Sequence, residues 1–299
     1  MQRRHIVWLA IGVAAVSTSA VLIRAADDRG ASSLAIAFYR CALASAVLVP
    51  IALTRHRAAL AALSRRRRWL VVASGAALAL HFVTWISSLS YTSVAASTVL
   101  VQTMPVWVAL AGPVTGERTS RRGWIGIGIA IAGSAVIATA GGGTGGSNQV
   151  LGDLLATAGA IFAAIYVLIG RQVRPHLSLV PYSASVYLVA ATGLAAAMAL
   201  TGTPFAGYSA QVWALFLAMT VGPQFLGHTV INHLLGELKA SIVSVALLAE
   251  AVGATVLAYL VFGERPGVQV VVGGAIVLAG VAVTVLAESE PAEVLQTDL

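Results

Sequence analysis

Four ionisable side chains lie within otherwise apolar stretches of the sequence: Arg40, His81, His228 and Glu250. A charged group inside a membrane is costly, and such residues usually face the interior of a helix bundle or a water-filled cavity. Glu250 stands nine residues beyond the start of the apolar run at 241–262, which is about 14 Å along a helix. Its carboxylate could bind a cation, exchange protons or hold helices together, and these three roles stay open.

Polar and aromatic residues also recur at a spacing of four, which places them on one face of a helix. The pairs are His81 with Trp85, Phe162 with Tyr166, and Gln224 with His228. Aromatic rings can cover a hydrophobic side chain and attract an ammonium group, and Gln224 or a histidine could hydrogen-bond a carboxylate. The same side chains could instead pack helices together or face lipid. We interpret Arg40 as structural, bonding carbonyl groups or reaching the outer surface.

The composition indicates a membrane protein. The chain is 59% hydrophobic and 10% charged, with a mean hydropathy of +0.90, whereas a soluble domain has about 25% charged residues. Apolar runs of about 20 residues can cross a hydrocarbon core, and helices satisfy their own backbone groups there. We predict an all-α polytopic membrane protein with ten transmembrane helices, at 6–24, 32–53, 69–90, 94–114, 123–140, 151–170, 180–201, 212–234, 241–262 and 268–287.

Arginine and lysine are distributed unevenly between the two sides of these spans. With the N-terminus inside, 14 of the 18 basic residues fall in inner segments, among them the run Arg65–Arg68. Because cytoplasmic loops carry the excess of basic residues, both termini are expected in the cytoplasm. The net charge of +7 then reflects topology, and the lack of a basic soluble domain argues against nucleic-acid binding.

The two halves of the chain repeat each other at an offset of 147 residues. The sequence GER at 116–118 recurs at 263–265, and Gly126 and Gly133 recur as Gly273 and Gly280. Each half contains five predicted helices, and an odd number gives the second half the opposite orientation. Inverted repeats are typical of secondary transporters that bind substrate near the midplane.

This repeat divides the chain into four parts. Residues 1–140 form the first five-helix repeat and residues 151–287 form the second. The glycine-rich segment at 141–150 reads as a flexible outer linker, and the acidic segment at 288–299 reads as a disordered tail.

The segments QTMPVWVALAGPVTGER (102–118) and LLAEAVGATVLAYLVFGER (247–265) carry a family resemblance. With LSYTSVAAS (89–97) and GDLLATAGAIFAAIYVLI (152–169), they resemble two copies of the EamA-type domain of the drug/metabolite transporter superfamily. The likeness covers essentially the whole chain. In the family, an acidic residue in the ninth span is commonly followed by proline, whereas Glu250 is followed by Ala251. A kink is therefore expected at Pro105 in the fourth span and is in doubt in the ninth.

The resemblance implies a transporter of the bacterial inner membrane that exports metabolites by alternating access. The subgroup of YddG-like amino-acid exporters is the preferred assignment. The family arrangement would place nine residues around a central substrate cavity: His81, Trp85, Thr103, Met104, Phe162, Tyr166, Gln224, His228 and Glu250. The expected partners are a small-molecule substrate and the lipid bilayer, with proton coupling as an open alternative.

Three other functions remain as alternatives. A lipophilic-drug exporter would share the fold, and a non-transporting receptor or assembly protein could share it too. An intramembrane enzyme is disfavoured, because the sequence has neither a GxSG-type nucleophile turn nor an HExxH metal helix. We therefore expect no enzymatic activity, no cofactor and no metal.

Overall fold

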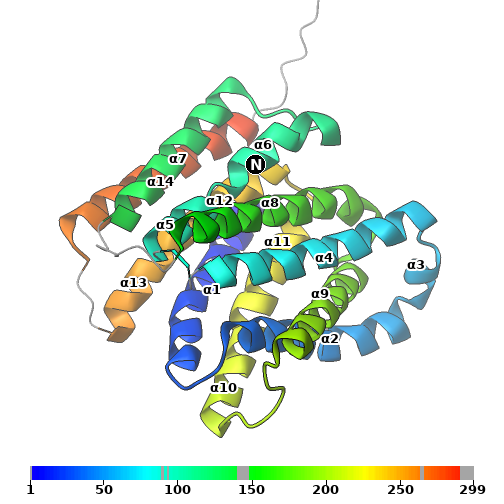
Figure 1. Ribbon diagram of the computed structural model, residues 1–299. Helices are drawn as coiled ribbons and strands as arrows, with labels where there is room; N and C mark the ends of the chain where they lie inside the picture. Colours follow the sequence, from blue (N-terminus) through cyan, green and yellow to red (C-terminus); the bar gives the residue numbers. More distant parts are fainter. Residues whose placement is uncertain (1, 89–90, 93, 140–147, 263–265, 290–299) are drawn as a thin grey trace, which may run out of the picture.

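A computed structural model describes residues 2–88, 91–92, 94–139, 148–262 and 266–289. The described residues are helical apart from short connections, and they contain no β-strand (Figure 1). Nine of their helices are long and apolar enough to cross a membrane, and a shorter apolar helix covers Val99–Thr115. The predicted all-α polytopic class is confirmed. The glycine-rich residues 141–147, the second GER at 263–265 and the tail from 290 lie outside the described residues.

The first half contains five spans and one short connecting helix. Its elements are α1 (Arg3–Asp27), α2 (Ser33–Arg55), the connecting α3 (Arg57–Ala61), α4 (Arg65–Ser88), a broken fourth span formed by α5 (Val94–Val101) and α6 (Met104–Thr115), and α7 (Arg121–Thr139).

The second half repeats this order. Its first two spans are α8 (Gln149–Val173), which ends in the 3₁₀ turn η1 (Arg174–His176), and α9 (Leu179–Thr201). The eighth span of the chain consists of α10 (Ala210–Met219), the π-helix η2 (Thr220–Thr229) and α11 (Val230–Leu234). The ninth consists of α12 (Ala240–Ala246), the 3₁₀ turn η3 (Leu247–Ala249) and α13 (Glu250–Phe262), and the tenth is α14 (Val268–Ser289). The last helix thus includes Glu288, which the sequence had assigned to the tail.

Several helices begin at residues that suit an N-cap. The Ser32 hydroxyl accepts a hydrogen bond from the Ala35 backbone at 3.2 Å, and the Asn148 side chain accepts one from Leu151 at 3.2 Å. Ser209 does the same for Val212 at the start of α10. These side chains satisfy N–H groups that have no partner inside the helix.

The packing of the helices has an approximate two-fold relation. The equivalent helices α7 and α14 pack against each other, as do the equivalent helices α2 and α9. The third span of the first half, α4, is equivalent to the eighth span, the third of the second half. Its contact with α8 therefore matches the contact of the eighth span with α1, and its contact with α9 matches the contact of η2 with α2. Every major contact therefore has a counterpart when the two halves are exchanged.

The contact between α7 and α14 depends on glycine. A Cβ at Gly126 would lie 2.8 Å from the Gly280 carbonyl oxygen, and a Cβ at Gly133 would lie 2.8 Å from that of Gly273. Because Gly126 is equivalent to Gly273, and Gly133 to Gly280, these are two copies of one contact, as a two-fold axis requires. Small residues let membrane helices approach closely in this way.

Replacing Gly133 by alanine is expected to destabilise the protein, because the new Cβ would lie 2.6 Å from the backbone nitrogen of Val277. Overpacking of this kind costs about 1–3 kcal/mol. Gly128→Ala is the matched control, since nothing lies within 4 Å of its Cβ position. Thermal unfolding in detergent should show a lower midpoint for Gly133→Ala and an unchanged or higher one for Gly128→Ala. Equal midpoints would refute the role of this contact.

Candidate functional site

Three spans are irregular at the level of one central cavity. The fourth span breaks at Gln102 and Thr103, and Pro105 opens the helix that follows. The ninth span changes to a 3₁₀ turn just before Glu250, although no proline follows that residue. The kink expected in the fourth span is confirmed, and the ninth span is interrupted as well. The eighth span contains a π-helix at 220–229. Broken helices of this kind surround the binding sites of many transporters.

The cavity has a volume of about 150 Å³ and is lined by side chains from both repeats. Six of the nine residues predicted for a substrate site contribute to its wall: His81, Trp85, Met104, Tyr166, His228 and Glu250. The structure therefore brings these six together from α4, α6, α8, η2 and α13.

Three predicted residues lie elsewhere. Thr103 and Phe162 are not part of the cavity wall. The Thr103 hydroxyl donates to the Leu100 carbonyl and accepts a bond from the Trp107 indole at 3.2 Å, so it is occupied at the helix break. Gln224 is fully buried behind the wall, where it binds Arg40.

Arg40, which we predicted to be a structural residue, lines the cavity. Its side chain does not reach the outer surface, because the residue is only 3% exposed. Its Nε donates to Gln224 Oε1 at 2.8 Å, and its guanidinium carbon lies 4.9 Å from the centre of the Phe82 ring. The available signal was its charge: Arg40 is the one arginine or lysine in the interior of a predicted span, opposite in sign to Glu250. Ser19, Gln102 and Ser244 also line the cavity. They are uncharged, so no charge within a span marks them in the sequence.

The two cavity histidines are equivalent positions of the repeat, since the offset of 147 relates His81 to His228. The His81 Nδ1 lies 2.9 Å from the Gly159 carbonyl oxygen. Nδ1 must therefore carry the proton and donate it to this acceptor. The imidazole is stacked on Trp85, with ring centres 5.8 Å apart. His228 contacts the rings of Phe82 and Tyr166.

Several buried polar atoms at the cavity have no hydrogen-bond partner among the described residues. They are Arg40 Nη2, Trp85 Nε1, Gln102 Oε1 and His228 Nδ1, with Gln224 Nε2 just behind the wall. Buried polar groups are nearly always satisfied, so each such exception needs an explanation. Ser289 Oγ is a further exception away from this cavity, but the other five gather around it, which is the pattern expected of a binding site.

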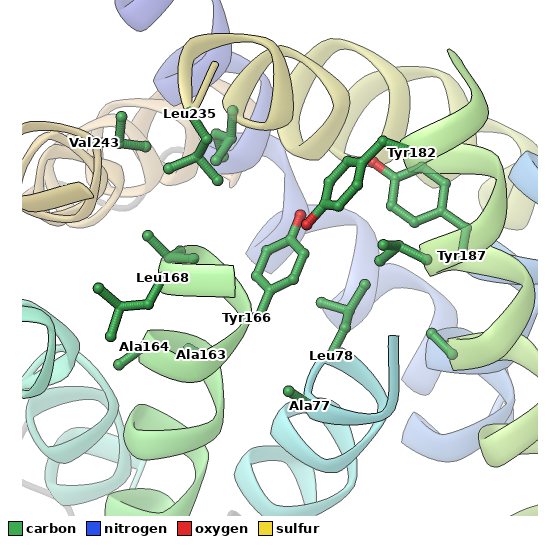
Figure 2. Packing of buried hydrophobic residues seen from close by; sticks show 14 of the residues in the cluster. Ala77, Leu78, Ala163, Ala164, Tyr166, Leu168, Tyr182, Tyr187, Leu235 and Val243 are labelled. Carbon is green, nitrogen blue, oxygen red and sulfur yellow. The ribbon is translucent and has the colours of Figure 1, made fainter. Parts of the chain in front are cut away.

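A buried hydrogen-bond network supports one side of the cavity. The Tyr166 hydroxyl donates to Asn232 Oδ1 at 2.5 Å, and the Asn232 amide donates to Ser183 at 3.2 Å and to Tyr187 at 3.4 Å. Figure 2 shows Tyr166 on α8 and Tyr182 and Tyr187 on α9 within the packed layer that also contains Leu78 of α4. The hydroxyl of Tyr166 is thus used in holding helices together.

Ion pairs join the two halves at the face that carries the N-terminus. Arg171 Nε lies 2.5 Å from Glu117 Oε1, and the other carboxylate oxygen of Glu117 accepts a bond from the Ala240 backbone at 3.0 Å. Lys239 lies 3.0 Å from Glu288, which also accepts a bond from the Ser120 backbone. Glu117, in the first GER, therefore links the end of α6 to α8 and to the start of α12.

A second group of charges on this face involves Glu237. The carboxylate lies 2.8 Å from His5 and 3.1 Å from Arg4. The hydrogen bond from His5 lowers the pKa of Glu237, and the positive charges of Arg4 and His233 act in the same direction. The charged form of Glu237 thus ties the start of α1 to the connection between α11 and α12. The described residues contain no cluster of three or more histidine, cysteine, aspartate or glutamate side chains suited to a metal ion.

Comparison with known proteins gives a family and a fold. A family model described as the EamA-like transporter family matches the chain twice, over residues 3–139 and 150–286. A solved structure titled only as the crystal structure of a protein is similar with a TM-score of 0.81, over 96% of this chain and 98% of that chain. At 19% sequence identity, this likeness shows the fold alone. No curated protein matches the sequence.

Replacing Tyr166 by phenylalanine is expected to reduce stability, because Asn232 Oδ1 would lose its hydrogen-bond donor in a buried site. An unsatisfied buried acceptor costs about 1–3 kcal/mol. Thermal unfolding in detergent measures the change. Leu168→Met, a volume-conserving change in the same helix, should have a smaller effect. A Tyr166→Phe protein as stable as the wild type would remove Tyr166 from the structural network.

Proposed function

The chain belongs to the EamA-like transporter family, and on that basis we propose that it exports small amphipathic metabolites, amino acids above all, by alternating access. The observation that carries this proposal is the cavity where interrupted helices of both repeats meet. His81 comes to it from the first half, and Glu250 comes from the second half. Opposed inverted repeats around one site can expose that site to each side of the membrane in turn.

The size of the cavity favours a small cargo. Pockets for drug-sized molecules usually have volumes of about 300–1,000 Å³, whereas this cavity has about 150 Å³. Its aromatic and imidazole rings beside charged groups suit a molecule with an apolar part and a polar end. The cavity thus supports a small amphipathic cargo over a larger lipophilic drug.

We further propose that the protein resides in the bacterial inner membrane with both termini in the cytoplasm. The support is the distribution of arginine, of which the run Arg65–Arg68 begins α4. The face that carries the N-terminus would then be the cytoplasmic face. Cargo would enter there, bind between the halves and leave on the outer side.

The ion pairs at the N-terminal face suggest how that side closes. Glu117 and Ser120 come from the first half, and their partners Arg171, Ala240 and Glu288 come from the second. Each contact would hold the two halves together and would have to break when this face opens. Any change that weakens them should favour the state open to the cytoplasm.

The first test measures transport directly. The purified protein is placed in liposomes that are loaded with a panel of amino acids. We expect these liposomes to release at least one amino acid faster than loaded liposomes that lack the protein. Flux is measured with and without a pH gradient, and Glu250→Gln is compared with the wild type. Unchanged flux in that variant would remove Glu250 from both substrate and proton handling. If lipophilic cations move and amino acids do not, the protein is a drug exporter, and if no solute moves, the transport proposal fails.

The second test addresses closure. Arg171→Gln removes a link between the halves. Arg174→Gln is its matched control, since the hydrogen bonds of Arg174 to other described residues go to the carbonyls of Asn232 and Leu177, both in the second half. With Cys41 replaced by serine, spin labels at exposed positions 118 and 176 report the separation of the two halves. We expect Arg171→Gln to populate longer distances and Arg174→Gln to leave the distribution unchanged. Identical distributions for the two variants would contradict this closing mechanism.

A further inference from the structure

The buried guanidinium of Arg40 is only partly satisfied by the protein. One of its N–H groups binds Gln224, and its guanidinium carbon lies over the Phe82 ring. Its Nη2 has no partner among the described residues. A charged group that is 97% removed from solvent requires hydrogen bonds and an opposite charge to be stable. The packed helices around Arg40 supply some of the hydrogen bonds, and no carboxylate forms an ion pair with it in the described part of the chain.

The neighbouring unpaired atoms are mostly donors. Gln224 binds the guanidinium through its oxygen, which leaves its amide Nε2 free, and the Trp85 indole can only donate. His228 Nδ1 is also free, and both His228 and Arg40 lie against the ring of Phe82. Of these residues Arg40, Trp85 and His228 line the cavity, whereas Gln224 lies behind its wall. A group in the cavity that pairs with Arg40 Nη2 is an acceptor, and a negative charge suits the guanidinium best. A carboxylate fits, because a guanidinium binds its two oxygens in a fork.

The cavity also holds the opposite charge. Glu250 lines it from the start of α13, and Gln102 presents an unpaired carbonyl oxygen from the break in the fourth span. Arg40 and Glu250 thus border the same space, while no ion pair within 4 Å joins them in the described structure. A molecule that carries both signs could therefore contact one of these charges at each of its ends.

We propose that Arg40 binds the carboxylate of the cargo, that Gln224 positions the guanidinium, and that Glu250 faces the cargo's ammonium group. This inference rests on the proposed transport function and narrows its substrate class to zwitterions with a free carboxylate. The two charges come from positions without a charged counterpart in the other repeat, since Arg40 is equivalent to Tyr187 and Glu250 to Thr103. The cargo is therefore held in one orientation.

The wild-type protein in liposomes tests this assignment without any substitution. The probes are phenylalanine and leucine, each compared with its decarboxylated amine and with the corresponding acid that lacks the amino group: phenethylamine and 3-phenylpropionate, and 3-methylbutylamine and 4-methylpentanoate. Each is measured as a competitor of the amino acid that moves fastest in the panel. Losing the carboxylate should weaken competition at least 10-fold, the effect of a charge-assisted hydrogen bond. Amines that compete as well as their amino acids would overturn the proposal while leaving transport established.

Substitution of Gln224 separates binding from structure. Gln224→Glu has nearly the same shape and places a carboxylate on Arg40, so it should stabilise the fold and abolish competition by amino acids. If Arg40 were only structural, Gln224→Glu would gain the same stability but would still transport amino acids normally. Normal transport by this variant would therefore refute the proposal. Arg40→Lys should retain part of the affinity that Arg40→Gln loses, because it keeps the charge without the fork. A failure of all solutes to move in the wild type would instead refute the transport function itself.

Discussion

A permanent positive charge in the middle of the helix bundle determines how the centre of this protein is organised. An arginine at the centre of a membrane span costs about 2.5–3.5 kcal/mol even by the mildest scale. Arg40 is tolerated because Gln224 and Phe82 are placed against it. Gln224 in turn lies in a π-helical segment, a rare form that occurs frequently at functional sites. The charge, its amide partner and the irregular eighth span thus form one unit.

The surrounding scaffold follows a different constraint, which is close and symmetric packing. The two halves meet along α7 and α14 through glycines that recur at the repeat offset, and α2 meets α9 in the same two-fold manner (Figure 1). Without a hydrophobic driving force between helices in lipid, such close contact supplies the association energy. The scaffold can therefore be symmetric while the cavity that it encloses is not.

These two constraints explain what the sequence could predict. Apolar runs and the positions of glycine depend on spacing along the chain, so the helices, the repeat and the break at Pro105 could be read directly. The break before Glu250 has no proline, so no residue type at this point of the sequence marks it. Phe162 was expected at the cavity because it shares a face with Tyr166, yet a rotation of the helix by a fraction of a turn decides which of them reaches it. Arg40 was undervalued because its partner Gln224 is 184 residues away.

The symmetry is kept for the histidines and lost for the charges. His81 and His228 are equivalent and both face the cavity, whereas Arg40 and Glu250 stand opposite Tyr187 and Thr103 in the repeat. A fully two-fold site would present the same groups to a ligand in either of two orientations, and it would bind an unsymmetrical molecule equally well both ways. One positive and one negative charge remove that ambiguity. The scaffold can then alternate between two nearly equivalent states while the bound molecule keeps a fixed direction relative to the chain.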